Sequence, residues 1–146
     1  MPSSLYKAFL QQRPLGRLVI VPTYDASLHG WGTIIRSNSG LIQPKEGGPP
    51  RQASLDMVIV GTYPPGWDIS DQVFREAAAG CLAAEAAIAA AKARGFQTRG
   101  CIILARNDAA SALAALRKGS PSPVLQEHAM RQSIWGSYPI EYHEYS

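Results

Sequence analysis

Apolar positions divide the chain into short β-rich runs separated by turn residues. A first run extends from Leu18 to Asp25, and a second follows a Gly-bearing turn and ends at Ile35, so the pair predicts a β-hairpin. A third strand is expected at residues 55–62. The stretch between, residues 37–54, is rich in Ser, Asn, Gly and Pro and predicts a long loop, with residues 41–42 as a candidate short strand.

One long helix should follow the third strand. Ser70 is the expected N-cap and Asp71 places a negative charge in the first turn, while Gly95 lies beyond the end expected near Ala93. Small or aliphatic side chains recur along it at helical spacing, which lets a helix lie close against a sheet. These residues are Ala77, Gly80, Cys81, Ala84, Ile88 and Ala91.

The rest of the chain alternates between strands and helices. Residues 101–104 are wholly apolar, as in a strand covered on both faces. Helices are expected at residues 109–118 and 124–135, and a last strand at 139–145. The order β-β-β-α-β-α-α-β predicts an α/β fold, with a mixed sheet and helices on its faces. We expect a single domain over residues 1–146, with residues 1–16 as a lead-in segment.

Composition narrows the class of protein. The 146 residues are 46% hydrophobic and 17% charged, which suits one domain with one core. A net charge of +3 and a pI near 9.0 suit a nucleic-acid partner without requiring one. Cys81 and Cys101 lie in apolar surroundings and are expected to be buried reduced thiols. We see no signal-peptide core or membrane-length apolar run, and expect a soluble intracellular protein with no membrane partner.

Carboxylates follow two of the predicted strands. Asp25 ends the first run and Asp108 lies just past the apolar run at residues 101–104. Residues at the carboxyl ends of strands form the functional edge of an open α/β sheet, and Glu76 near the helix start would complete a cluster if the two strands are adjacent. Such a cluster suits Mg²⁺, and two ions about 3.5–4 Å apart support phosphodiester hydrolysis.

An aspartate that follows a strand also has a purely structural interpretation. Asp108 could cap the helix that follows it, because Asp is common at that position. Glu85 competes with Glu76 for the place beside the aspartates. The two lie nine residues apart, on opposite sides of the helix at about 100° per residue, and the helical wheel does not choose between them.

Several motifs then resemble one family. The stretch 24–27 (Tyr-Asp-Ala-Ser), followed by Gly-Trp-Gly at 30–32, resembles the first motif of the ribonuclease H domains of retroelement reverse transcriptases. Residues 75–80 resemble the Glu-bearing helix of that family, and residues 104–108 the strand that ends in its third acid. Residues 112–135 are similar to the following segment in DIRS-type and related retroelements. The resemblance covers about residues 17–145.

The resemblance implies a ribonuclease H-like fold with a mixed five-stranded sheet. It also implies two Mg²⁺ or Mn²⁺ ions held by Asp25, Glu76 and Asp108, and it favours Glu76 over Glu85. The implied activity is cleavage of the RNA strand of an RNA–DNA hybrid, in a chain whose parent carries an upstream polymerase domain. The nearest candidates to contact nucleic acid are Ser27, Arg75 and Asn107, with a turn hydroxyl, a solvated helix residue and a loop amide as the alternatives.

The chain also departs from the family. The members of this family carry a fourth acid on a helix after the last strand. This sequence stops at Ser146, and the C-terminal helix is therefore expected to be missing. Glu141 and His143, on one face of the last strand and opposite Glu144, are candidates to substitute, with a solvated edge strand as the alternative. Ala109 stands where many relatives carry a polar residue.

Three functions therefore compete. The first is a metal-dependent endonuclease of the ribonuclease H type. The second is a non-catalytic module of the same fold that binds nucleic acid or a protein partner in a larger assembly. The third, an unrelated small α/β enzyme or nucleotide binder, has little support because the Gly-Trp-Gly motif lies in a hairpin and lacks a third glycine.

The tryptophans and two of the histidines are expected to have structural roles. The three tryptophans could stack on bases, but packing roles are expected for them. The histidines at 29 and 128 show no partner at ligand spacing and are expected to be ordinary surface or helix residues. The tryptophans are Trp31, Trp67 and Trp135.

Overall fold

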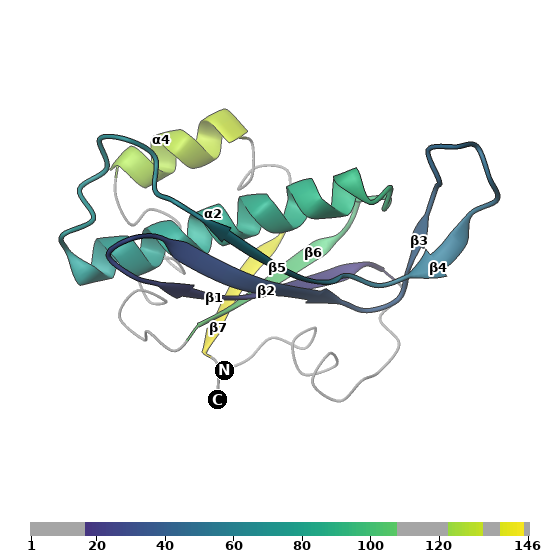
Figure 1. Ribbon diagram of the computed structural model, residues 1–146, viewed down its shortest axis with the longest axis horizontal. Coiled ribbons are helices and arrows are strands. Elements are labelled where there is room, and N and C mark those ends of the chain that lie inside the picture. The colour runs from purple at the N-terminus through teal and green to yellow at the C-terminus, as the bar shows by residue number, and fades with distance from the viewer. Residues whose placement is uncertain (1–16, 108–122, 133–137, 145–146) are drawn as a thin grey trace.

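A computed structural model describes residues 17–107, 123–132 and 138–144 (Figure 1). Its centre is a five-stranded sheet in the order β5-β2-β1-β6-β7. Strands β5, β2 and β1 pair antiparallel, and β6 and β7 are added parallel to β1. The prediction of a mixed α/β sheet is confirmed. The strands are β1 (Val19–Ala26), β2 (Trp31–Ser37), β5 (Asp56–Gly61), β6 (Ile102–Asn107) and β7 (Ile140–Glu144).

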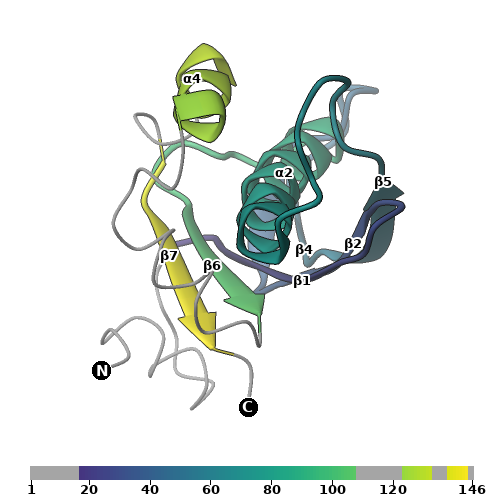
Figure 2. The same cartoon turned by 90° about the vertical axis from the view of Figure 1, so that its left-hand side faces the viewer.

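Two helices lie on the same face of this sheet. The long helix α2 (Gln72–Ala93) crosses the sheet, and α4 (Pro123–Gln132) lies beside it (Figures 1 and 2). The other face, called the outer face below, carries no helix among the described residues. The helix expected at residues 109–118 falls outside them. No helix in the described ranges combines the length and apolar character needed to cross a membrane.

The expected long loop at residues 37–54 contains a second, small sheet. Strands β3 (Gly40–Ile42) and β4 (Arg51–Ala53) pair antiparallel, which confirms the candidate strand at 41–42 and adds β4, a strand that was not predicted. Ile42 anchors the hairpin, because it is 3% exposed and forms a bridge to Phe96. Polar side chains in β4 gave no sequence signal for a strand.

The start of α2 also differs from the expectation by one residue. Asp71, not Ser70, is the N-cap, and its carboxylate accepts hydrogen bonds from the backbone N–H groups of Val73 and Phe74. Ser70 instead donates its hydroxyl to Asp68, at 2.6 Å. The other end of the helix agrees with the prediction, since Gly95 follows it with φ of +88°.

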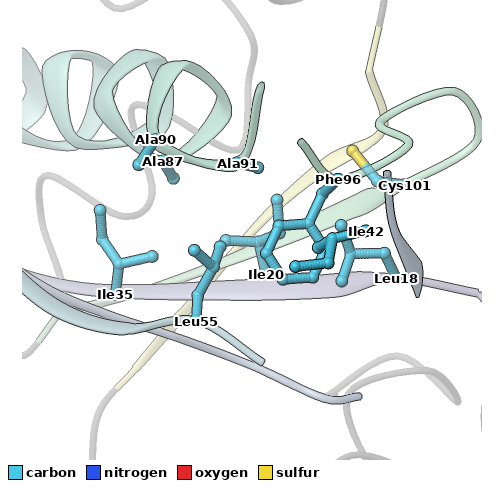
Figure 3. Close-up of a cluster of buried hydrophobic side chains, with 10 residues drawn as sticks. All are labelled: Leu18, Ile20, Ile35, Ile42, Leu55, Ala87, Ala90, Ala91, Phe96 and Cys101. Carbon is cyan, nitrogen blue, oxygen red and sulfur yellow. The ribbon is translucent and has the colours of Figure 1, made fainter. Parts of the chain in front are cut away.

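The predicted small-residue stripe of α2 faces the sheet and is buried throughout. Figure 3 shows one end of the resulting core, where alanines of α2 lie over Ile20, Ile35 and Leu55. Cys81 and Cys101 are buried and free, as expected. Burial, together with the nearby Glu85 carboxylate, raises the pKa of the Cys81 thiol to about 12 and so keeps it protonated at neutral pH.

Candidate functional site at the carboxyl end of strand β1

The strands that carry the predicted aspartates are neighbours. Thr23 of β1 pairs in parallel register with Arg106 of β6, so the carboxyl ends of both strands lie at the same edge of the sheet. Asp25 is the last residue but one of β1. Asp108 directly follows β6 but lies outside the described residues. The adjacency required for the predicted acid cluster is therefore present.

Asp25 itself points to the outer face. Its neighbours Tyr24 and Ala26 both pack against the alanines of α2, so strand alternation turns the Asp25 side chain the other way. The residue is exposed, and its Oδ1 accepts a hydrogen bond from the N–H of Ala26 at 2.9 Å. The second carboxylate oxygen, Oδ2, makes no hydrogen bond within the described part of the chain. Asp25 thus presents an accessible, hard oxygen ligand.

Glu76 approaches the same end from the helix side. It lies in the second turn of α2 and is 8% exposed. The pKa of the Tyr63 hydroxyl is raised, and both carboxylates contribute to the rise. Burial raises the Tyr63 pKa most, the Arg75 guanidinium and a hydrogen bond to Ser27 lower it, and the Glu76 and Asp25 carboxylates raise it. Both carboxylates therefore lie within electrostatic range of one hydroxyl group.

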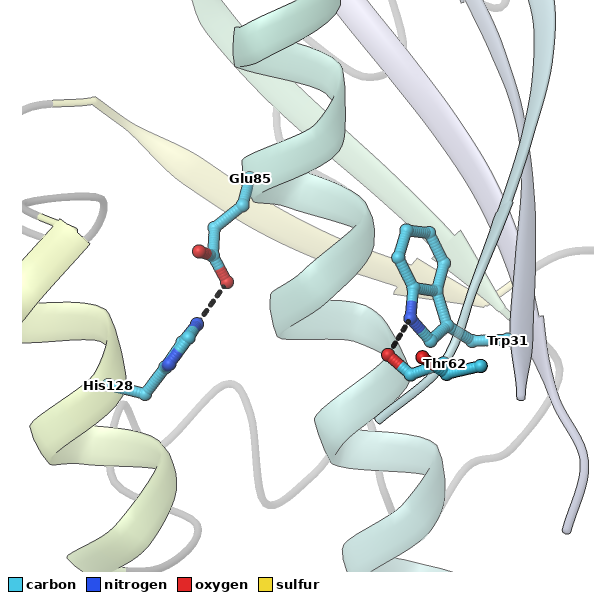
Figure 4. Close-up of polar contacts among 4 residues, drawn as sticks. All are labelled: Trp31, Thr62, Glu85 and His128. Carbon is cyan, nitrogen blue, oxygen red and sulfur yellow. Dashed lines mark hydrogen bonds and ion pairs between the residues drawn. The ribbon is translucent and has the colours of Figure 1, made fainter. Parts of the chain in front are cut away.

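Tyr63 is a site residue that sequence reasoning missed. Its hydroxyl lies 2.9 Å from the carbonyl oxygen of Ser27 and 3.0 Å from that of Gly30, in the turn between β1 and β2. Next to it, Trp31 Nε1 donates to the carbonyl of Thr62 at 3.2 Å (Figure 4). These contacts join the Asp25 hairpin to the segment that enters α2. In the sequence, Tyr63 precedes two prolines, a context that indicates only an ordinary turn residue.

The predicted nucleic-acid contacts all take part in hydrogen bonds within the protein. The Ser27 hydroxyl donates to the Gly30 carbonyl at 3.1 Å and accepts from two turn N–H groups. Asn107 is 2% exposed, and its Nδ2 donates to the Tyr24 carbonyl at 2.6 Å, which fastens β6 to β1. Arg75 Nη1 donates to the Ile69 carbonyl at 2.9 Å. A further contact of these residues with nucleic acid stays a prediction.

Glu141 and His143 lie on one face of β7, as expected. His143 Nε2 is 2.9 Å from Glu141 Oε1. His143 pairs with Arg106, which itself pairs with Thr23, so this couple shares the outer face with Asp25. The side chain of His143 is only 9% exposed. The alternative of a solvated edge strand is therefore wrong for this residue, while substitution for a fourth acid stays a prediction.

Glu85 faces a different partner. Its Oε2 lies 2.6 Å from Nε2 of His128 on α4 (Figure 4). His128 is a helix residue, as expected, but its ring has a partner that the spacing of residues in the sequence did not reveal. Burial raises the pKa of Glu85, and His128 partly opposes that change. Glu85 is thus directed at α4, whereas Glu76 lies at the Asp25 end of the helix.

The tryptophans within the described residues pack against neighbours. Trp31 is partly buried and packs against a core cluster that includes Tyr24 and alanines of α2. The ring of Trp67 meets those of Phe74 and His128 edge to face, with centroids 6.1 and 5.1 Å apart. Both agree with the packing roles expected for them. His29 is exposed in the hairpin turn, and Trp135 lies outside the described residues.

Two open hollows adjoin Asp25, with volumes of about 440 and 300 Å³. Both are bordered by Asp25 and Gly32. The larger follows the hairpin turn, and the smaller extends along the outer face toward Ile34 and Val58. An accessible carboxylate beside a hollow is an arrangement that can hold a cation and admit a phosphate.

The predicted metal site is not complete within the described ranges. There, no three His, Cys, Asp or Glu side chains gather to hold an ion, and Asp108 lies outside those ranges. The carboxylates that are described have the hard oxygen donors that Mg²⁺ and Mn²⁺ prefer. No protein-family model matches the chain, and a search of curated proteins also found no match.

Proposed function

We propose that this chain is a metal-dependent endonuclease of the ribonuclease H type, which cuts the RNA strand of an RNA–DNA hybrid. The supporting observation is that β1 and the start of α2 bring Asp25 and Glu76 to one end of a mixed five-stranded sheet, where β6 leads directly into Asp108. The mixed five-stranded sheet is compatible with the fold that the resemblance in the sequence implies.

Asp25, Glu76 and Asp108 would hold two divalent cations in this proposal. Bound there, the ions would help to deprotonate an attacking water and neutralise charge on the leaving oxygen. Among the chain's own residues, Tyr63 holds the hairpin that carries Asp25 in place, and Asn107 holds the end of β6 against β1. The scaffold thereby fixes the spacing of the ligands, on which an in-line displacement depends.

The test is cleavage of a labelled RNA–DNA hybrid with Mg²⁺ or Mn²⁺. Because Asp25 is exposed, Asp25→Asn should leave the fold intact yet lower cleavage by about a hundredfold or more, since mutation of even the groups that hydrogen-bond to metal ligands costs about 10–100-fold. Asp56→Asn is the matched control, since Asp56 is exposed in β5 and makes only a surface ion pair of 3.6 Å with Arg36. Its cleavage rate should equal that of the wild type.

A second pair of variants separates the two glutamates of α2. Glu76→Gln should abolish cleavage, whereas Glu85→Gln should retain it, because Glu85 faces His128. If Asp25→Asn cuts as well as the wild type, the assignment of the site fails. If the wild type does not cut with either ion and Mg²⁺ does not raise its melting temperature, the non-catalytic module replaces the enzyme, since a ligand of the native state must stabilise it.

A further inference from the structure

Positive charge is concentrated in the segments around the start of β1 and the end of α2. Residues 17–18, 36–56 and 92–101 contain seven Lys or Arg and two Asp or Glu, which gives a net charge of +5. The other described residues contain three Lys or Arg and eight Asp or Glu, which gives a net charge of −5. The whole chain carries only +3, so its composition conceals this division.

Contacts between distant parts of the chain bring the three positive segments together. Leu18, Ile42 and Phe96, one from each segment, pack in a single core cluster (Figure 3). The backbone N–H of Gln43 donates to the carbonyl of Gly95 at 3.0 Å. Figure 1 accordingly shows the β3–β4 hairpin at the end of the molecule where α2 terminates. The three segments form one end of the molecule, called the basic end below.

Most cations of the basic end are available to a partner. Arg36 forms a surface ion pair with Asp56 at 3.6 Å, and the Lys92 ammonium lies 5.7 Å from the centre of the Tyr138 ring. The other five cations are exposed and form no ion pair within the described part of the chain. They are Arg17, Lys45, Arg51, Arg94 and Arg99.

Helix capping explains only part of this charge. Lys92 and Arg94, at the end of α2, complement the negative C-terminal end of the helix dipole. Arg17 precedes β1, Arg51 begins β4 and Arg99 lies between α2 and β6, so none of these three is on a helix. Like charges that gather repel one another and oppose folding, unless a partner supplies negative charge. The basic end therefore indicates an anionic partner.

The chemistry of the basic end favours a nucleic-acid duplex over an acidic protein. Its one large hydrophobic side chain that is exposed among the described residues is Leu41, at 52%, whereas protein interfaces are built on apolar and aromatic anchors. Four of the five available cations are arginines, whose planar guanidinium binds phosphate oxygens in pairs. They come from three separate segments, which suits an extended polyanion. A duplex carries one negative charge per about 1.7 Å of its axis.

We infer that the basic end is a separate docking surface for the phosphate backbone of a nucleic-acid duplex. It lies away from the candidate metal site, because Arg94 follows Glu76 by 18 residues, about 27 Å along a helix. Binding there needs neither divalent ions nor cleavage, so the inference goes beyond the proposed function. Contacts to phosphates alone carry no sequence information, and we expect binding without sequence preference.

The experiment measures binding of a fluorescent DNA duplex and of an RNA–DNA hybrid to the full chain by anisotropy, in EDTA and at several salt concentrations. The wild type should bind both, and its Kd should rise steeply with salt. Arg51→Gln and Arg94→Gln should each lower the slope of log Kd against log salt by about 1. Together they should raise the Kd by about tenfold or more, because each removes a charged hydrogen-bond donor. Melting temperatures should stay close to the wild-type value, since both side chains are exposed.

Gln72→Glu is the matched control. It lowers the net charge by one unit, as Arg94→Gln does, but at the other end of α2. The two positions are 22 residues apart, about 33 Å along a helix, which exceeds the Debye length of about 10 Å at 0.1 M salt. Gln72→Glu should therefore keep the Kd and the salt slope of the wild type.

The outcomes separate this inference from the proposed function. Weaker binding by the arginine variants, with unchanged binding by Gln72→Glu, supports it whether or not the chain cuts RNA. Equal binding by the wild type and the double arginine variant overturns it, and so does a wild type that binds neither duplex. An equal loss in Gln72→Glu also overturns it, because net charge alone would then explain the affinity.

Two further measurements identify the partner and the surface. Polyglutamate should displace the labelled duplex less well than unlabelled duplex of equal total charge. Equal displacement would make an acidic protein the partner and overturn the inference. Asp25→Asn should bind both duplexes in EDTA as the wild type does. Weaker binding by this variant would place the duplex at the candidate metal site and overturn a separate surface.

Discussion

At the scale of single residues, the Tyr63 hydroxyl helps to fix the geometry of the candidate site. It contacts two carbonyl oxygens of the turn that follows Asp25, at 2.9 and 3.0 Å. The turn is also held by the Ser27 hydroxyl, so the hairpin is fixed both from within and from the segment that enters α2. The position of the hairpin that carries Asp25 is thus set by hydrogen bonds within the protein.

Tyr63→Phe removes this hydroxyl and keeps the ring. We expect the free energy of unfolding to fall by about 1 kcal/mol, because the turn carbonyls lose one donor and the ring packing stays. Urea denaturation measures it. Tyr138→Phe is the control, since the Tyr138 hydroxyl makes no hydrogen bond within the described ranges and its ring lies 5.7 Å from the Lys92 ammonium. Equal stability of the two variants would show that the Tyr63 contacts contribute nothing measurable.

At the scale of elements, α2 depends on side chains small enough to let it approach the sheet. Ala84 is 0% exposed and packs with Ile88 and Ile103. Ala84→Leu should lower stability by about 1–3 kcal/mol, because three further carbons must enter a filled interior. Ala89→Leu is a matched control on the exposed side of the same helix, where the two residues have similar helix propensity. Thermal unfolding compares them, and a similar loss in both would contradict close packing at Ala84.

The elements that sequence predicted well are those whose signals are local. Five strands and α2 follow from β-branched runs, the helical repeat of small residues, and turn residues such as Gly95. Strand β4 escaped prediction because Arg51, Gln52 and Ala53 carry little sequence signal for a strand. They pair with β3, whose Ile42 is buried in the core. The N-cap was misplaced by one residue because Ser70 and Asp71 are equally good caps, and only the backbone decides between them.

The candidate site likewise contains residues that the sequence predicted and residues that it did not. Asp25 was predictable because it ends a strand, and Glu76 because the family motif includes it. Tyr63 and the Glu85–His128 pair were not, since each depends on how segments 33 to 43 residues apart come together. Asn107 was expected to contact nucleic acid, yet the parallel register of β1 and β6 directs its amide to a backbone carbonyl. Such long-range contacts follow from packing, which periodicity does not encode.

At the scale of the whole molecule, the candidate site residues belong to both faces of one sheet. Asp25, Glu141 and His143 belong to the outer face, and Glu76 to the face covered by α2. In the proposed function they would act together at the carboxyl edge of the strands. The spacing between Asp25 and Glu76 would then depend on how firmly the helical layer is held on the sheet.

The contact between α2 and α4 should make that layer sensitive to pH. Burial raises the pKa of Glu85 above its ordinary value of 4.5, with partial opposition from His128 on α4, and among the described residues the Cys81 thiol also lies within electrostatic range. The folded chain then keeps a proton on Glu85 at pH values where the unfolded chain has lost it. This contribution to stability is fully present below about pH 4.5 and is lost as pH rises through the raised pKa.

Glu85→Gln tests this linkage, because glutamine has no proton to lose. The free energy of unfolding of the wild type, measured relative to Glu85→Gln, should fall as pH rises from 4.5 toward neutrality. Glu46→Gln, a change at an exposed residue between β3 and β4, should keep the wild-type dependence on pH. Urea denaturation at a series of pH values gives the three curves. Parallel curves for wild type and Glu85→Gln would show that the buried carboxyl does not couple protonation to the packing of α4 on α2.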